Sequence, residues 1–200
     1  GQQVWRYDDA TANWLLVVQD AVLDVALSEQ QFWYLTNQGL WQWDQSSERP
    51  VLLSDQASWF LLRYQSGQLW LTGSNRLYSY QLAEQQLRTY DVGPCIAPPC
   101  LDVRQIQDLV PEQQELWLLT PDQLYHYEVQ RNTTKLTLLL QNKWQVPWQQ
   151  LHMLKQDQHI WLWSRQQLNL LHLADQSLLK WQLNQGEQLL PFQVQLVDHQ

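Results

Sequence analysis

The sequence predicts an all-β fold, a β-propeller with four complete four-stranded blades plus a split or incomplete fifth blade. Two observations carry this prediction. A tryptophan recurs at positions 33, 70, 117 and 161, and the spacings of 37, 47 and 44 residues match the length of a propeller blade. Aromatic side chains beside them alternate with a period of two, as in Trp41 and Trp43, which is typical of strands and unlike helical repeats.

Each repeat is expected to form four strands. The tryptophan is followed seven residues later by a leucine, and turn residues such as Pro121 and Asp122 lie between them, which indicates a hairpin. The expected strands are 22–27, 31–36, 40–43 and 50–53; 59–64, 68–72, 76–82 and 86–92; 106–110, 115–120, 123–129 and 135–141; and 151–155, 159–164, 168–173 and 178–183. Most tryptophans, including Trp5, are then expected to pack between neighbouring blades.

The two ends of the chain supply the split blade. Residues 4–8 match 40–44, so the chain is expected to enter at a third strand and to continue into a fourth strand at 14–18. Residues 192–197 are expected to form a first strand. The two ends join into a fifth blade, or the chain is a piece of a longer propeller, or four blades close a ring with loose ends. The repeat phase favours a piece of something larger. On any of these interpretations residues 1–200 form a single propeller domain or fragment, with blades at about 22–53, 59–92, 106–141 and 151–183.

Composition limits the function classes. Twelve basic residues are scattered among twenty acidic ones, giving a net charge of −8, so a nucleic-acid partner is not expected. The hydrophobic fraction of 44% suffices for a sizeable core. The apolar runs are too short to span a bilayer, so we expect membrane contact only through segments outside this chain.

The repeat resembles the two-component regulator propeller repeat, which occurs in extracytoplasmic sensor regions of bacterial histidine kinases, hybrid kinases and diguanylate cyclases. Residues 32–44 (FWYLTNQGLWQWD) match it best, whereas the later repeats lack the equivalent of Gly39. The resemblance implies a non-enzymatic periplasmic ligand-sensing domain of a signalling receptor. Residues 173–181 lean toward the quinoprotein-like and assembly-lipoprotein propellers, which implies the alternative of a periplasmic scaffold that binds another protein.

No catalytic, cofactor or metal site is expected. Nucleophile elbows and phosphate-binding loops are missing from the sequence, and the five histidines lack metal-ligand spacing, so they are interpreted as surface or strand-edge residues. The carboxylates of Asp20 and Asp24 are interpreted as loop-end or turn residues. Cys95 and Cys100 flank a proline-rich loop and are expected to form a disulfide, which requires an oxidising compartment; the alternative is two free thiols.

Ligand binding is expected on the face at the mouth of the central channel. In a propeller the connections from the fourth to the first strand and from the second to the third emerge there, and loops carry recognition. The ligand would be a small molecule, a saccharide or a peptide, and an unpaired strand edge makes a homodimer a further expectation. The candidate binding residues are Asp55, Gln56, Trp59, Arg76, Arg104, Trp148 and Arg165. For Trp59 and Trp148 the alternative is that they begin inner strands and only pack.

Overall fold

A computed structural model describes residues 2–8, 12–28, 31–44, 49–92, 101–129, 134–141, 152–164 and 167–182. These residues form four antiparallel sheets and one short 3-10 helix, η1 (Val103–Gln105), and the described part of the chain contains no α-helix. None of its helices could cross a membrane. The all-β prediction is therefore confirmed.

Each sheet follows the chain order of its strands. Sheet A contains β1 (Gln2–Asp8), β2 (Asn13–Leu27), β3 (Phe32–Thr36), β4 (Gly39–Asp44) and β5 (Arg49–Ser54). Sheet B contains β6 (Trp59–Gln65), β7 (Gln68–Gly73), β8 (Leu77–Gln81) and β9 (Gln86–Tyr90). Sheet C contains β10 (Asp108–Glu112), β11 (Glu115–Leu119), β12 (Gln123–Val129) and β13 (Thr134–Gln141). Sheet D contains β14 (His152–Gln156), β15 (His159–Trp163), β16 (Gln167–His172) and β17 (Leu178–Gln182).

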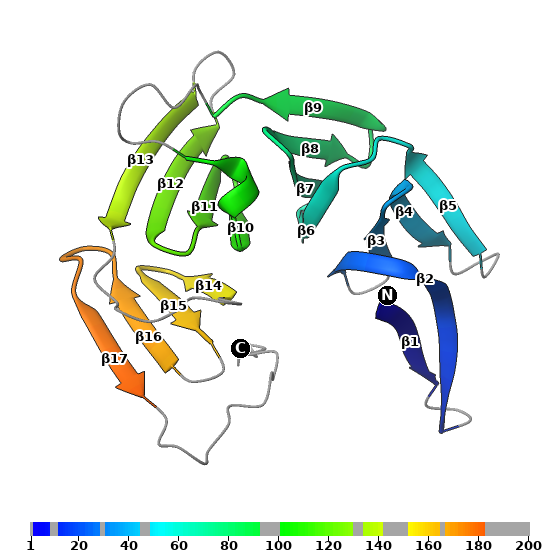
Figure 1. The fold of residues 1–200 in the computed structure, drawn as a ribbon, viewed down its shortest axis with the longest axis horizontal. Coiled ribbons are helices and arrows are strands. Elements are labelled where there is room, and N and C mark those ends of the chain that lie inside the picture. Colours follow the sequence, from blue (N-terminus) through cyan, green and yellow to red (C-terminus); the bar gives the residue numbers. More distant parts are fainter. Residues whose placement is uncertain are drawn as a thin grey trace.

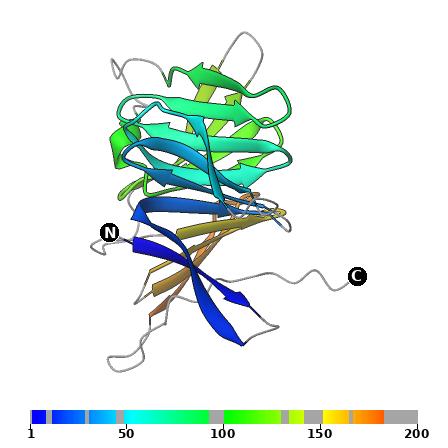
Figure 2. The ribbon, with the colours of Figure 1, turned by 90° about the vertical axis from the view of Figure 1, so that its right-hand side faces the viewer.

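The sheets follow one another along an arc around a central space (Figure 1). The C-terminal half of β2 and the strands β6, β10 and β14 lie nearest the centre, and each contacts the next one along the arc. Figure 2 shows the same sheets from the side, with their strands crossing the thickness of the molecule. This arrangement is consistent with a β-propeller.

Strand β2 departs from the prediction. The sequence suggested two strands, at 14–18 and 22–27, and the structure has one continuous strand of 15 residues. Its first half pairs with β1 and its second half with β3, and register shifts near Val4 accommodate the change of partner. The segment 19–21 (QDA) contains neither glycine nor proline, so nothing in it forces the strand to end.

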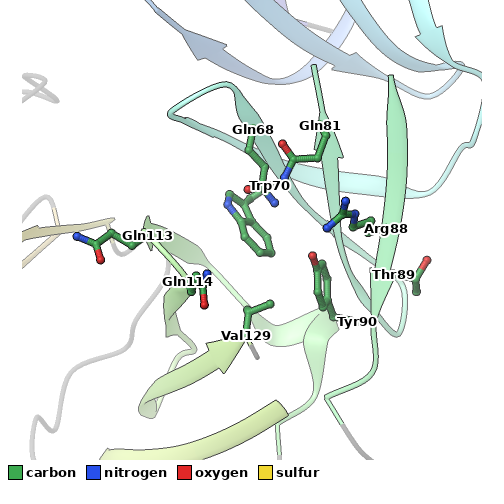
Figure 3. A pocket seen from close by; sticks show the side chains of 9 residues that line it. All are labelled: Gln68, Trp70, Gln81, Arg88, Thr89, Tyr90, Gln113, Gln114 and Val129. Carbon is green, nitrogen blue, oxygen red and sulfur yellow. The ribbon is translucent and has the colours of Figure 1, made fainter. Parts of the chain in front are cut away.

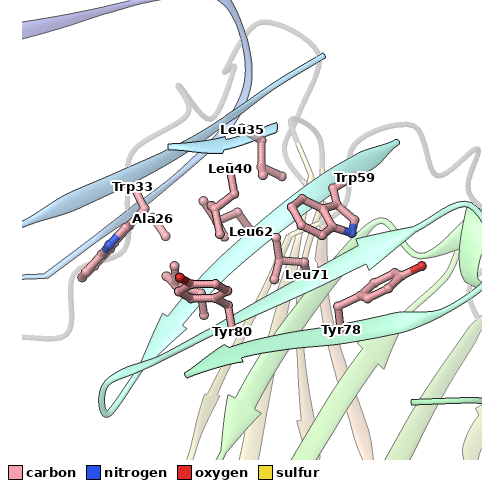
Figure 4. Close-up of a cluster of buried hydrophobic side chains, with 10 residues drawn as sticks. Ala26, Trp33, Leu35, Leu40, Trp59, Leu62, Leu71, Tyr78 and Tyr80 are labelled. Carbon is pink, nitrogen blue, oxygen red and sulfur yellow. The ribbon is translucent and has the colours of Figure 1, made fainter. Parts of the chain in front are cut away.

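Buried apolar clusters fill the interfaces between neighbouring sheets. Between sheets A and B, Trp33 and Leu40 pack against Leu62 and Tyr80 (Figure 4). Equivalent clusters join B to C and C to D. Trp33, Trp70 and Trp117 are buried, as their place in the repeat predicted. Trp5 does not follow this prediction, because its residue surface is 50% exposed.

Sheet D has no described neighbour on its outward face. Trp161 occupies the repeat position of the three buried tryptophans, but here it is only partly buried and stacks on Trp181, with ring centroids 6.2 Å apart. Trp181 and Leu179 on β17 are exposed. The hairpin of β1 and β2 lies at the other end of the arc from sheet D (Figure 1).

Candidate functional site

The predicted binding residues at the start of sheet B divide into exposed and buried ones. Asp55 and Gln56 lie exposed in the connection between β5 and β6, where the Gln56 amide N–H donates to Ser54 Oγ over 3.3 Å. Trp59 is only 2% exposed, and its ring packs edge-on against Tyr78. The side chain of Trp59 therefore belongs to the core, as in the alternative in which it only packs.

Arg76 and Arg104 lie on the surface with acidic partners. Arg76, in the turn between β7 and β8, places Nε 3.1 Å from Asp91 Oδ1. Arg104, in η1, places Nη2 2.8 Å from Asp102 Oδ2. The hydrogen bond from the Arg104 side chain lowers the pKa of Asp102. Both guanidinium groups are exposed, so a ligand could displace either partner at small cost.

The remaining predicted residues, Trp148, Arg165, Cys95 and Cys100, lie outside the described residues, and so does the predicted strand at 192–197. The predicted binding set and the disulfide stay predictions. Among the described members, no hydrogen bond or ion pair joins Asp55, Gln56, Trp59, Arg76 and Arg104 to one another. They lie at the loop ends of sheets B and C, and none of them lines the cleft between these two sheets that is described below.

An ion bridge across three inner strands was missed by the sequence analysis. Arg63 on β6 lies between Asp24 on β2 and Asp108 on β10. Its Nη1 donates to Asp24 Oδ2 over 2.8 Å, and its Nε donates to Asp108 Oδ1 over 3.1 Å, with a second short contact from Nη2. The interpretation of Asp24 as a loop-end residue is wrong, because Asp24 lies inside β2 and faces the next inner strand.

The two carboxylates also hold main-chain groups. Asp24 Oδ2 accepts the Leu62 N–H of sheet B over 2.8 Å, and Asp108 Oδ2 accepts the Met153 N–H of sheet D over 2.8 Å. Each Oδ1 accepts the N–H of its own following residue over 2.9 Å. Each carboxylate therefore clips its inner strand to the inner strand of the next sheet. These hydrogen bonds pair main-chain N–H groups that the hydrogen-bond ladders within each sheet leave unpaired.

Electrostatics keep the bridge charged. Burial opposes the charge of Arg63, but Asp108 and Asp24 beside it outweigh burial, so the pKa of Arg63 is raised above its ordinary value. Asp108 is 3% exposed, so it depends on these partners to compensate its desolvation. His152 Nδ1 lies 4.0 Å from Asp108 Oδ2 at the edge of the bridge. The bridge thus joins the inner strands of sheets A, B and C through one guanidinium group.

The sequence did contain a signal for this bridge. Asp24 and Asp108 each stand nine residues before a repeat tryptophan, Trp33 and Trp117, and the same position holds Leu61 and His152 in the other repeats. A carboxylate recurring in every second repeat at an inner-strand position, beside an arginine, is the pattern that predicts such a link. It becomes visible only when the repeats are aligned by their inner strands.

A cleft of about 390 Å³ opens between sheets B and C (Figure 3). It lies at the opposite end of β6 from Gln56, because β6 runs from Trp59 to the turn before β7. The sequence predicts binding at the other face and does not indicate this cleft. Its lining is rich in amide and aromatic side chains and consists of Gln68, Trp70, Gln81, Arg88, Thr89, Tyr90, Gln113, Gln114 and Val129.

His126 is less exposed than the sequence suggested, whereas His152 and His159 are exposed, as the interpretation as surface residues predicts. His126 lies on the interior strand β12, stacks on Trp117 with ring centroids 4.6 Å apart, and places Nε2 3.0 Å from Glu115 Oε2. His159 and His172 pair across β15 and β16. Within the described ranges no group of three or more His, Cys, Asp or Glu side chains could hold a metal ion.

Several solved structures share this fold at low sequence identity. Two structures of the extracellular domain of BT4673 from B. thetaiotaomicron, described as a putative one-component system and as a putative hybrid two-component system, each superimpose with a TM-score of 0.57 and 16% identity, over 80% and 78% of this chain. PorZ, an essential bacterial surface component of the type-IX secretion system of Porphyromonas gingivalis, superimposes with a TM-score of 0.60 and 11% identity over 90% of it.

The chain spans less than a quarter of these proteins: 22% of the first BT4673 structure and 24% of PorZ. At such identities the likeness describes the fold alone. No family model and no curated protein matches the sequence.

Proposed function

We propose that this chain is part of a non-enzymatic, extracytoplasmic ligand-sensing region of a bacterial signalling receptor. The observation that supports it is the fold shared with the extracellular domain of BT4673, together with the resemblance of residues 32–44 to the two-component regulator repeat. The predicted bridge between Cys95 and Cys100 would fit an oxidising periplasm.

Within this proposal the fold is a β-propeller in which sheets A to D are four blades. The fifth sector is filled by the hairpin of β1 and β2 together with the predicted strand at 192–197. Support comes from the apolar outward face of sheet D, where Trp161 takes the repeat position that is buried in the other three sheets. Exposed apolar faces of this size normally have a partner.

The test of the sensing proposal uses the complete protein that contains this chain. We expect its reading frame to encode a membrane span and a signalling domain, and we expect alkaline phosphatase fused directly after Gln182 to be active. A reading frame without a membrane span and a signalling domain, or an inactive fusion beside an active cytoplasmic reporter fusion at the same site, would contradict the proposal.

A second candidate function is a periplasmic scaffold that binds another protein. The observation that favours it is the fold shared with PorZ, the secretion-system surface component, combined with the exposed Leu179 and Trp181 on the edge strand β17. An edge strand with apolar side chains can accept a strand from a partner. Crosslinking of the complete protein in cells should then trap one partner, and Trp181→Lys should abolish that product while Leu52→Lys on β5 leaves it intact.

A further inference from the structure

We infer that the cleft between sheets B and C is a binding site for a small, uncharged, hydroxyl-rich ligand such as a mono- or disaccharide. This inference deepens the proposed sensing function, and rests on it for its biological role. Its volume of about 390 Å³ falls in the range of small-molecule sites. Its position differs from the channel-mouth face on which the sequence suggested binding.

The polar lining consists of amides with unused hydrogen-bonding capacity. Gln68 and Gln81 come from sheet B, and Gln113 and Gln114 form the turn between β10 and β11 of sheet C (Figure 3). None of these four side chains hydrogen-bonds another described residue. An amide both donates and accepts, as a sugar hydroxyl does, so four of them around one cleft suit a ligand with several hydroxyl groups.

The aromatic lining supplies an apolar surface. The rings of Trp70 and Tyr90 lie 5.4 Å apart between centroids and are tilted by 34°, and the Tyr90 hydroxyl is held by Ser79 at 3.1 Å. Trp70 is nearly buried and forms the floor, whereas Tyr90 is half-buried and presents more of its ring. A fixed aromatic ring can pack against the C–H face of a sugar while the amides bind its hydroxyl groups.

The charge of the cleft disfavours anions. Arg88 is the one charged side chain in its lining, and its Nη2 lies 3.1 Å from Glu84 Oε2 and within 3.4 Å of Gln86 Oε1. The guanidinium is therefore already paired, and the chain as a whole carries a net charge of −8. A phosphate, nucleotide or uronate would have to displace Glu84 from this exposed pair, and the net negative charge of the chain would repel it.

The test measures binding by isothermal titration calorimetry to the full chain. The probes are maltose, cellobiose and N,N′-diacetylchitobiose as neutral sugars, with digalacturonate and trialanine as comparisons. We expect at least one neutral sugar to bind at millimolar concentration or better. The double variant Gln81→Ala, Gln114→Ala should bind about tenfold more weakly, which corresponds to about 1.4 kcal/mol. The matched control Gln56→Ala, at the other end of β6, should bind as the parent does.

Three results would overturn the inference: no binding of the neutral sugars, tighter binding of digalacturonate or trialanine, or sugar binding that Gln56→Ala weakens and the double variant does not. Circular dichroism and thermal unfolding confirm that each variant is folded. The sensing proposal fails separately. If the complete protein binds sugar in the cleft but has no signalling output, the binding site is supported and the sensing proposal is contradicted. If the receptor signals but binds none of the sugars, only the binding site is contradicted.

Discussion

Arg63 is the cation that compensates the carboxylates of Asp24 and Asp108 on the neighbouring inner strands. Replacing it by methionine keeps much of the side-chain volume but leaves Asp108, which is almost fully buried, without its cation. Breaking a buried ion pair from one side costs about 3–5 kcal/mol, and the partial exposure of Arg63 places our expectation for Arg63→Met at about 2–4 kcal/mol of unfolding free energy. Urea denaturation followed by tryptophan fluorescence measures it.

Arg104→Met provides the matched control, because the pair of Arg104 with Asp102 is exposed. Its loss should cost much less stability than the loss of Arg63, because solvent screens an exposed pair. Equal destabilisation by the two substitutions would show that the bridge contributes no more than a surface pair. A double-mutant cycle of Arg63→Met with Asp24→Asn isolates the coupling between those two side chains.

Tyr125 gives the fold an alkaline limit. Burial, with a smaller contribution from Asp122, raises the pKa of Tyr125 to about 12, and its hydroxyl donates to Gln123 Oε1. In the unfolded chain the phenol ionises near pH 10, so the folded state holds this proton more tightly and its stability falls as the pH rises from about 10 to about 12. We expect Tyr125→Phe to lose less stability over this interval than the parent. Identical alkaline slopes in denaturation curves would contradict the assignment.

At the scale of the element, the hairpin of β3 and β4 depends on Gly39. Its φ is +142°, and a Cβ atom there would collide with the main-chain carbonyl oxygen of Ser54. Gly39→Ala therefore requires the backbone of β4 or β5 to move, and we expect a loss of more than about 2 kcal/mol in unfolding free energy.

Gly67 is the comparison for Gly39. It also has a positive φ, +80°, but a Cβ there meets open space. Gly67→Ala should cost only the conformational strain, about 1 kcal/mol. The unfolding free energies of the two variants, measured by chemical denaturation, distinguish steric collision from backbone strain. A smaller loss of stability for Gly39→Ala than for Gly67→Ala would contradict the packing of Ser54 on the hairpin.

The strands were predictable because each repeat carries its own local evidence. Alternation around Trp70 and Trp117, with turn residues between hairpin strands, set strand positions to within about two residues. The continuity of β2 was not predictable, since residues 19–21 suit a strand or a connection equally well and the pairing with β1 decides. The strand expected to begin at Ile106 begins at Asp108 instead, after the single-turn helix η1, whose N-cap is Asp102.

The candidate site was predicted less well, for a physical reason. Arg63 and Asp24 meet across two sheets, and so do the four glutamines of the cleft with Tyr90. Contacts of this kind depend on how neighbouring sheets are rotated against each other. The alternation of side chains along a single strand does not encode that rotation. Tryptophan at the start of an inner strand suggested recognition, but Trp59 is core, because its side chain points at Tyr78 of the same sheet.

For the whole molecule, the outward face of sheet D tests the proposed fifth blade. Trp181 and Val51 are similarly exposed among the described residues, at 43% and 41%, on β17 and β5, and Val51 lies on the face of sheet A that is turned toward sheet B. If a further blade covers β17, Trp181→Lys should lower the unfolding free energy by about 1.5–3 kcal/mol, whereas Val51→Lys should change it by about 0.5 kcal/mol or less. Equally small effects of the two substitutions would contradict the proposed blade.

The same measurement at two protein concentrations, with light scattering, separates a blade of the same molecule from a second copy. A loss of stability independent of concentration supports closure within one molecule. A mass that doubles in the parent and not in Trp181→Lys would assign the face to a homodimer instead.

The two carboxylates that accept a main-chain N–H of the next sheet do not join every pair of neighbouring sheets. Asp24 ties sheet A to sheet B and Asp108 ties sheet C to sheet D, but the equivalent residue in sheet B is Leu61, which offers no acceptor. Across the inner strands, the polar link between B and C among the described residues is the side chain of Arg63, with no main-chain hydrogen bond to a carboxylate like those at Asp24 and Asp108. The glutamine-lined cleft opens between these same two sheets, at the boundary that lacks such a main-chain link.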